Sequence, residues 1–190
     1  MELFYGKIGE VTNEEYERAY GIMSCSRQAE VERMRFEGDK KRSVLGEWLA
    51  RKAVSALCGL AEKDILFAKT ENGKPYCLNA ETFFSISHCK DMAVCVAHNG
   101  EIGIDVELIR DIDYRITRFA CVDADLDYLN SAENEEEKRL RFFRIWTAKE
   151  AYVKYIGTGI RDLKTISYAE IAKHCQTRIE DGYMITVYCE

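Results

Sequence analysis

The sequence predicts an α+β fold made of two similar halves, residues 1–100 and 101–190. Apolar side chains recur at helical spacing through the first sixty residues, whereas the stretch that follows is broken into short runs suited to strands. Each half reads as helices followed by a hairpin, and the run Met92-Ala-Val-Cys-Val-Ala is echoed by Met184-Ile-Thr-Val-Tyr-Cys. The chain has one proline, Pro75, and no Ser/Gly-rich linker, so we expect the two halves to pack as one compact unit.

Three helices are expected at the N-terminal end of the chain, over 13–23, 27–36 and 39–60. The third has an apolar face at helical spacing, and Gly59 ends it. Short strands then follow over 65–68, 76–78, 83–87, 92–97 and 102–107, with turns at Asn72-Gly73 and Asn99-Gly100. The first half is therefore expected to place helices on a small sheet.

The second half repeats this order. A short helix is expected over 123–129 and a long one over 135–156, which has an acidic first turn that suits the helix dipole and ends at Gly157. Strands are expected over 164–167, 177–180 and 183–189, with Asp181-Gly182 as a tight turn.

Composition excludes several classes of protein. A net charge of -6 argues against a nucleic-acid binder, and the chain contains neither a signal peptide pattern nor an apolar run long enough for a membrane span. We therefore expect a cytoplasmic protein with no membrane partner. The eight cysteines show no zinc-ligand spacing, so we expect reduced thiols.

The charges are unevenly distributed. Residues 27–52 hold eight Lys or Arg against five acids, whereas residues 100–137 hold twelve acids against three Arg. Solvated helix faces would produce such runs. The alternative is a basic patch for an anionic ligand or partner, together with an acidic pocket for a metal ion.

The strongest chemical signal is the strand Ile102-Gly-Ile-Asp105-Val-Glu107. Its two carboxylates are two residues apart, so both project from one face. Paired carboxylates repel unless a cation or a proton intervenes, and carboxylate oxygens are ligands that Mg²⁺ prefers. A solvent-facing strand edge that carries two charges is the alternative.

Three further segments add to this signal. In the long helix, Trp146, Glu150 and Lys154 share one i, i+4 row, which an ordinary surface ion pair would also produce. Ser87-His88 closes a strand just before a turn, where side chains can face a ligand. The turn Asn72-Gly73-Lys74-Pro75 offers backbone N–H groups and one ammonium to a phosphate.

Together, and in this order, these segments resemble the 4'-phosphopantetheinyl transferase superfamily, particularly its surfactin-type branch. The resemblance lies in Ser87-His88, the strand from Gly103 to Glu107 and the helix motif from Trp146 to Gly159, and it extends to the segment around Arg42. It implies a pseudo-two-fold fold of two α/β halves with the active site between them. Cys89 and Ser85 depart from residues common in the family, and the tail after Leu163 is short.

The resemblance also implies an activity: transfer of the phosphopantetheine arm of coenzyme A to a serine of an apo acyl or peptidyl carrier protein. Mg²⁺, with Mn²⁺ as an alternative, would be held by Asp105, Glu107 and Glu150. Glu150 would act as the base, and His88 and Lys154 would stabilise the developing charge. The residues that would contact coenzyme A are Arg27, Arg42, Lys74, Pro75, Ser87, His88 and Lys154.

Three alternatives remain open at this stage: another branch of the same superfamily and two other classes of protein. The small trimeric holo-synthase branch shares the chemistry but has about half this subunit size, so the length of the chain favours a monomer. A non-catalytic coenzyme A or nucleotide-binding module would keep the fold without turnover. An acidic adaptor that recruits helices would need neither metal nor coenzyme A.

Overall fold

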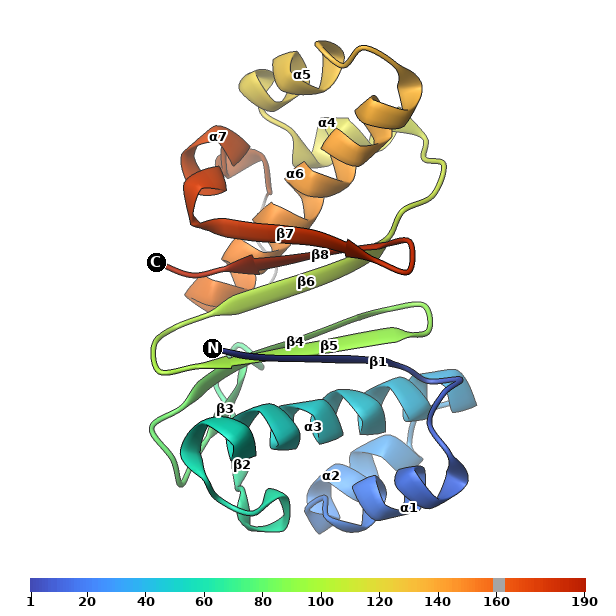
Figure 1. The fold of residues 1–190 in the computed structure, drawn as a ribbon, viewed down its shortest axis with the longest axis vertical. Helices are drawn as coiled ribbons and strands as arrows, with labels where there is room; N and C mark the ends of the chain where they lie inside the picture. The colour runs from blue at the N-terminus through green and yellow to red at the C-terminus, as the bar shows by residue number, and fades with distance from the viewer. Residues whose placement is uncertain (159–162) are drawn as a thin grey trace. The chain divides into compact units, whose positions relative to one another are not determined.

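The computed structural model describes residues 1–158 and 163–190 of the chain (Figure 1). It divides into two compact units, Met1–Glu101 and Ile102–Glu190, called here the N-unit and the C-unit. Each combines helices with an antiparallel three-stranded sheet, which confirms the predicted α+β class. The packing of the halves around a shared site stays a prediction. Gly159, part of the helix motif, lies outside the described residues.

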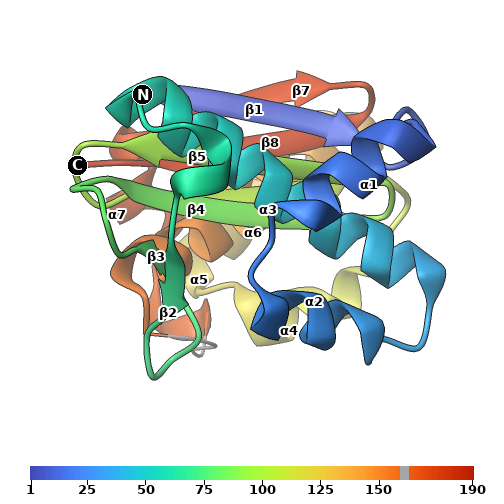
Figure 2. The ribbon, with the colours of Figure 1, turned by 90° about the horizontal axis from the view of Figure 1, so that it is seen from below.

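The sheet of the N-unit consists of β1 (Glu2–Lys7), β5 (Met92–His98) and β4 (Phe83–Cys89), in that order. β4 and β5 form the predicted hairpin, but β1 was not predicted. It pairs with β5 from Glu2 opposite Ala97 to Lys7 opposite Met92, so its strand character depends on residues far along the chain. A separate ribbon joins β2 (Phe67–Lys69) to β3 (Pro75–Cys77) (Figure 2).

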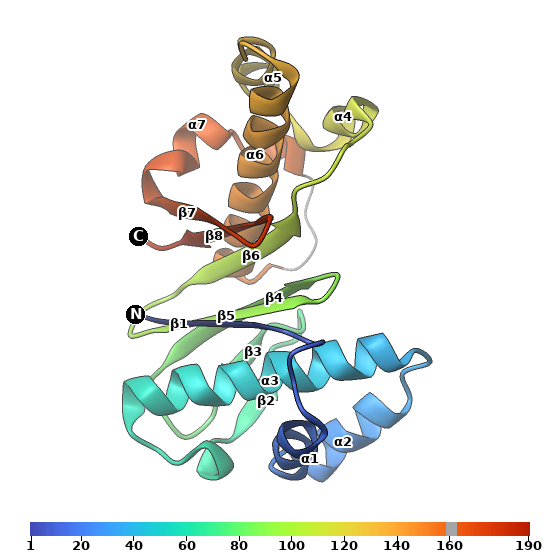
Figure 3. The same cartoon turned by 45° about the vertical axis from the view of Figure 1, so that its right-hand side comes forward.

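The three α-helices of the N-unit begin at a side-chain cap or end at glycine, and a short 3-10 helix follows them. They are α1 (Asn13–Gly21), α2 (Cys25–Glu32), α3 (Glu37–Cys58) and the short η1 (Glu62–Asp64). Thr12 and Glu15 form a capping box before α1, and Gly59 ends α3 with a φ of 78°. α3 packs against the sheet on one side and against α1 on its opposite side (Figure 3). Its buried face supplies much of the core of this unit.

The C-unit repeats the topology of the N-unit. Its sheet has the order β6 (Gly103–Leu108), β8 (Tyr183–Tyr188), β7 (Cys175–Glu180). In both sheets the strand that comes last in the chain therefore lies in the middle. The helices are η2 (Tyr114–Ile116), α4 (Thr117–Ala120), α5 (Asp123–Asn130), α6 (Glu135–Ile156), η3 (Leu163–Thr165), α7 (Tyr168–Ile171) and η4 (Ala172–His174).

The long helix α6 has the predicted limits, whereas the predicted strand over 164–167 is wrong. That segment contains the end of η3 and the residues that lead into α7. Leu163 and Ile166 bury their side chains in the core of the C-unit, so packing there outweighs the strand preference of β-branched Thr165 and Ile166. The predicted turn at Asp181-Gly182 is present, and both residues have positive φ, 51° and 80°.

Gly103 lets β6 approach α6 closely. A Cβ atom added there would lie 1.9 Å from the carbonyl oxygen of Ala151 and 2.6 Å from the backbone nitrogen of Tyr155. Both atoms belong to the helix backbone, which cannot move aside as a side chain can. The close approach brings the side chains of β6 within reach of those on α6.

The sequence predicted no membrane span and reduced thiols, and the described residues bear on both predictions. No helix among them has the length and apolarity needed to cross a membrane. The eight cysteines are all free thiols, and burial raises the pKa of Cys121 to about 11 and that of Cys175 to about 12. These two thiols are therefore weak nucleophiles at neutral pH.

Candidate active site

The two carboxylates of β6 project from one face of the sheet of the C-unit. Asp105 is 5% exposed, and Glu107, two residues later, is half-buried. Opposite Asp105, the central strand places Thr186, which is fully buried. A solvent-facing strand edge, the alternative weighed for these two acids, is therefore wrong for Asp105.

α6 brings a cation to this pair. Lys154 Nζ donates a hydrogen bond to Asp105 Oδ1 over 2.7 Å, and the Lys154 side chain is 30% exposed. One partner of Lys154 is thus a carboxylate 49 residues earlier in the chain. An ion pair that joins a buried strand to a helix fixes the side of α6 that faces β6.

Glu150 belongs to the same cluster. Burial is the main cause that raises the pKa of Glu150 above its ordinary value, and the negative charges of Asp105 and, more weakly, Glu107 raise it further, while Lys154 opposes them. The structure therefore brings together all four residues that the sequence predicted for this half. A carboxylate with a raised pKa is a better proton acceptor near neutral pH than an ordinary glutamate.

The donor set is suitable for a hard divalent cation. Asp105, Glu107 and Glu150 offer only carboxylate oxygens, the ligand type that Mg²⁺ and Mn²⁺ prefer, and their mutual repulsion would be relieved by a cation. As they stand, the described residues contain no group of three His, Cys, Asp or Glu side chains arranged to hold a metal ion. The Lys154 ammonium supplies positive charge to Asp105.

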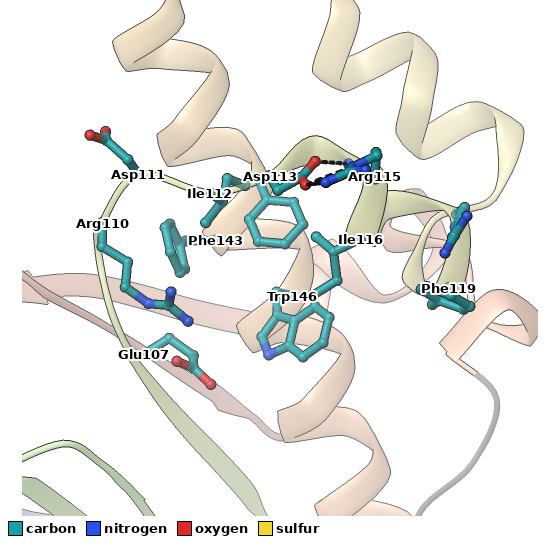
Figure 4. A pocket seen from close by; sticks show the side chains of 12 residues that line it. Glu107, Arg110, Asp111, Ile112, Asp113, Arg115, Ile116, Phe119, Phe143 and Trp146 are labelled. Atoms are coloured by element: carbon teal, nitrogen blue, oxygen red, sulfur yellow. Dashed lines mark hydrogen bonds and ion pairs between the residues drawn. The ribbon is translucent and has the colours of Figure 1, made fainter.

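A pocket of about 590 Å³ adjoins Glu107 in the C-unit (Figure 4). Phe143 and Trp146 of α6 form an aromatic wall, and Ile116 and Phe119, from the end of η2 and from α4, contribute further apolar surface. Three arginines, Arg110, Arg115 and Arg118, also line it. Sequence reasoning assigned no role to this pocket. The signal was present in the three arginines that interrupt the acidic stretch over 100–137.

Arg27, on α2 of the N-unit, is held by an internal network. Its Nε donates to Glu47 Oε2 over 3.1 Å, its Nη1 donates to Glu30 over 2.8 Å, and its Nη2 donates to Ser43. Arg51 binds the other oxygen of Glu47 through Nε and Nη2, at 3.1 and 2.9 Å. Arg27 is therefore a positioned cation whose present partners are protein side chains.

Arg42 and His88 lie near the same turn of the N-unit. Arg42 Nη1 donates to the carbonyl oxygen of Lys90 over 2.8 Å, two residues after His88, and Arg42 also contacts Asp39. His88 is exposed near the end of β4, whereas Ser87 is buried. The side chain of Lys74, which precedes Pro75 and β3, donates to Glu101 over 2.6 Å.

Two family models match this chain, one over each unit. The model of the 4'-phosphopantetheinyl transferase superfamily matches residues 101–185, and the model of the 4'-phosphopantetheinyl transferase N-terminal region matches residues 10–100. These two ranges are close to the C-unit and the N-unit.

Individual relatives carry the same description. The 4'-phosphopantetheinyl transferase gsp of Aneurinibacillus migulanus is 38% identical over 64% of this chain and 51% of its own length. The relative psf-1 of Bacillus pumilus is 36% identical over 73% of this chain and 60% of its own length. Sfp of Bacillus subtilis is 31% identical over 79% of this chain and 67% of its own length. The chain thus spans about half to two thirds of the length of these relatives.

Two units of the same helix-and-sheet topology, one of which carries carboxylates and a lysine together on a strand and a long helix, define the class of this protein by fold and site. Within that class, this chain belongs to the 4'-phosphopantetheinyl transferase superfamily, in the branch that contains Sfp, gsp and psf-1.

Proposed function

We propose that this protein transfers the 4'-phosphopantetheine group of coenzyme A to a serine of an apo acyl or peptidyl carrier protein and releases adenosine 3',5'-bisphosphate. The observation that carries the proposal is the convergence of Glu150 and Lys154 of α6 with Asp105 and Glu107 of β6. Family membership supports the same activity, since relatives along most of this chain are named 4'-phosphopantetheinyl transferases.

In the proposed reaction, the carrier serine oxygen attacks the β-phosphorus of coenzyme A, which bears the pantetheine. A new bond joins the serine oxygen to this phosphorus while the bond from phosphorus to the bridging oxygen breaks. The serine proton passes to Glu150, the carboxylate that joins the cluster from a separate helix. Negative charge grows on the bridging oxygen, and Lys154 and His88 would supply the positive charge that stabilises it.

Asp105, Glu107 and Glu150 are the residues that would hold Mg²⁺, or Mn²⁺ in its place. When bound, the ion supplies Lewis-acid stabilisation to the diphosphate. Asp105 also accepts a hydrogen bond from Lys154. Lys154 would therefore exchange part of its contact with Asp105 for contact with a phosphate oxygen when substrate binds.

The N-unit would supply contacts to coenzyme A. Lys74 and His88 would contact the phosphates, and Arg42 and Arg27 would contact the adenosine and its 3'-phosphate. Pro75 and Ser87 would add further contacts to coenzyme A. The hydrogen bonds that hold Arg27 and Arg42 in place support a role in binding an anionic ligand, because each guanidinium is already oriented by its neighbours.

The partner would dock on a basic face of the N-unit. This face consists of Arg33, Arg35, Lys40 and Lys41, on and between α2 and α3, and an acidic carrier helix would complement it. Charge reversal at these four positions should weaken carrier binding and remove most of its salt dependence, as measured by titration calorimetry at two salt concentrations. Unchanged affinity would place the carrier elsewhere.

The activity itself has a direct test. The protein is incubated with apo carrier proteins, coenzyme A and either Mg²⁺ or EDTA, and the mass of each carrier is then read. We expect a phosphopantetheine increment only on carriers with the acceptor serine and only when metal is present. Binding of coenzyme A without any mass increment on a panel of carriers would favour the non-catalytic module. Gel filtration of the same sample tests the proposed monomer.

A further inference from the structure

The residue before Glu150 is a buried cation that the proposed chemistry does not use. The Lys149 side chain is fully buried, and its Nζ donates three hydrogen bonds: to Asp125 Oδ2, to the carbonyl oxygen of Ala120, and to the carbonyl oxygen of Leu163 at 3.2 Å. An ammonium group has three N–H donors, so all of them are used. Lys149 therefore has no capacity left to bind a substrate phosphate.

Asp125 extends this anchor to two more helices. Its side chain is 1% exposed, and its Oδ2 accepts from the backbone nitrogen of Val122 over 3.0 Å, at the start of α5. Its Oδ1 accepts from the backbone nitrogen of Tyr168 over 2.9 Å, at the start of α7. One buried ion pair thus ties α4, α5, η3 and α7 to the long helix.

The element held by Ala120 is a wall of the pocket beside Glu107. Ala120 is the last residue of α4, and Arg118 and Phe119 of the same short helix line the pocket together with Ile116. A four-residue helix has little stability of its own, so its position depends on tertiary contacts. The ammonium of Lys149 holds its C-terminal carbonyl in place.

We propose that Lys149 is a positioning residue: through Ala120 it holds α4 as the wall of the pocket beside Glu107, and so sets how well that pocket accepts substrate. The kinetic part of this proposal rests on the proposed transferase function, and the structural part does not. Lys149 acts through α4 and does not touch the reacting atoms.

The test must separate this role from a general contribution to folding. Lys149→Met alone would leave Asp125 buried without its counter-charge and could unfold the C-unit. The double variant Lys149→Met/Asp125→Asn removes both charges, which restores charge balance but not the hydrogen bond to Ala120. Lys149→Arg keeps a cation at the position and serves as the conservative rescue.

Arg141→Gln provides a matched control. Arg141 also lies on α6 and also donates to a backbone carbonyl and a carboxylate, those of Tyr128 and Glu137, but the carbonyl that it binds belongs to α5 and not to α4. If any loss of a cation-to-carbonyl anchor on α6 disturbed the pocket, this control would behave like the double variant.

Amide hydrogen exchange and kinetics are measured on the full chain. In the double variant we expect exchange over 117–122 to rise at least about tenfold while β6 and β8 keep wild-type protection. We also expect the KM of coenzyme A or of the carrier to rise at least about fivefold with kcat within about twofold, and Lys149→Arg to recover most of the loss.

Wild-type exchange over 117–122 in the double variant would overturn the proposal, as would wild-type KM values. Faster exchange spread evenly over the C-unit would also overturn it, because the ion pair would then serve the fold alone. If the wild-type protein transferred no phosphopantetheine, the proposed function would fail, while the exchange measurement would still decide whether Lys149 holds α4.

Discussion

The N-unit and the C-unit share a scaffold and differ in the chemistry that it carries. Their long helices α3 and α6 each span 22 residues and end at a left-handed glycine, Gly59 or Gly157. Counted back from that glycine, three pairs of positions correspond: Trp48 with Trp146, Arg51 with Lys149 and Lys52 with Glu150. Each helix also packs on a sheet whose last strand in the chain lies in the middle.

The corresponding buried cations, Arg51 and Lys149, each bind one carboxylate and two backbone carbonyl oxygens. Arg51 binds the carboxylate of Glu47 and donates to the carbonyl oxygens of Glu62 and Ile65, at 2.8 and 2.9 Å. Lys149 binds a carboxylate and two carbonyl oxygens in the C-unit. Anchoring a neighbouring loop to the long helix is therefore common to both units, although only in the C-unit does the anchored segment form the wall of the pocket beside Glu107.

The next position differs. In the N-unit it is Lys52, whose ammonium lies 3.7 Å from the ring centroid of Trp48, and in the C-unit it is Glu150. Four positions further on, the pair is Ala56 and Lys154. α3 and α6 thus differ at two corresponding positions, and in the C-unit both of these positions carry residues of the cluster around Asp105.

The largest effect should come from Gly103→Ala, because the added Cβ would meet the backbone of α6 at Ala151. The matched change in the N-unit is Gly46→Ala, where the Cβ would lie 3.2 Å from one methyl carbon of Ile86. We expect Gly103→Ala to cost more than about 3 kcal/mol of unfolding free energy, and Gly46→Ala less than about 1 kcal/mol. Denaturant titration measures both, and equal costs would mean that the two helix–sheet contacts are alike.

Glu150→Ala should remove transfer while the protein stays folded, with a loss of at least about a thousandfold in rate. Lys52→Ala, at the corresponding position of the N-unit, should leave the rate unchanged within about twofold. The measurement is the initial rate of carrier labelling, with circular dichroism as the check on folding. Wild-type turnover in Glu150→Ala would remove Glu150 from the mechanism.

Lys154→Ala should lower the rate by about tenfold to a thousandfold, because its charge would stabilise the leaving group and is absent from the matching Ala56. Single-turnover labelling at saturating coenzyme A isolates the chemical step. A rate equal to that of the wild type would reduce Lys154 to a partner of Asp105.

The smallest expected effect is a change of stability with pH. Because the folded-state pKa of Glu150 is raised, its contribution to stability is fully present below the ordinary value of 4.5 and is lost as pH rises through the folded value. Glu150→Gln should therefore match the wild type at low pH and exceed its Tm by a few degrees at pH 7, in EDTA. Thermal scans across this range test the sign, and a lower Tm for Glu150→Gln at pH 7 would contradict it.

The sequence predicted elements whose signals are local. The limits of α6 followed from its apolar spacing, acidic first turn and Gly157, and the hairpin turn at Asp181-Gly182 followed from its residue types. β1 escaped prediction because its partner β5 lies about ninety residues away. The segment over 164–167 was misassigned because burial of Leu163 and Ile166 decides its conformation.

The candidate site divides in the same way. Asp105, Glu107, Glu150 and Lys154 were found from a strand pattern, a helix row and a family resemblance. No local pattern links Lys149 to Asp125, which lies 24 residues earlier, or to a carbonyl oxygen at Ala120. Contacts to backbone carbonyls leave no trace in residue type, so only coordinates could place the anchor and the pocket.

The two-sided binding of Glu47 has a consequence for Arg27. Glu47 gives one oxygen to Arg27 and the other to Arg51, and both Glu47 and Arg51 are buried. If Arg27 swings toward an arriving nucleotide, the glutamate it leaves behind still has a guanidinium beside it. Movement of Arg27 would therefore leave no buried carboxylate without a counter-charge, because Arg51 would still neutralise Glu47.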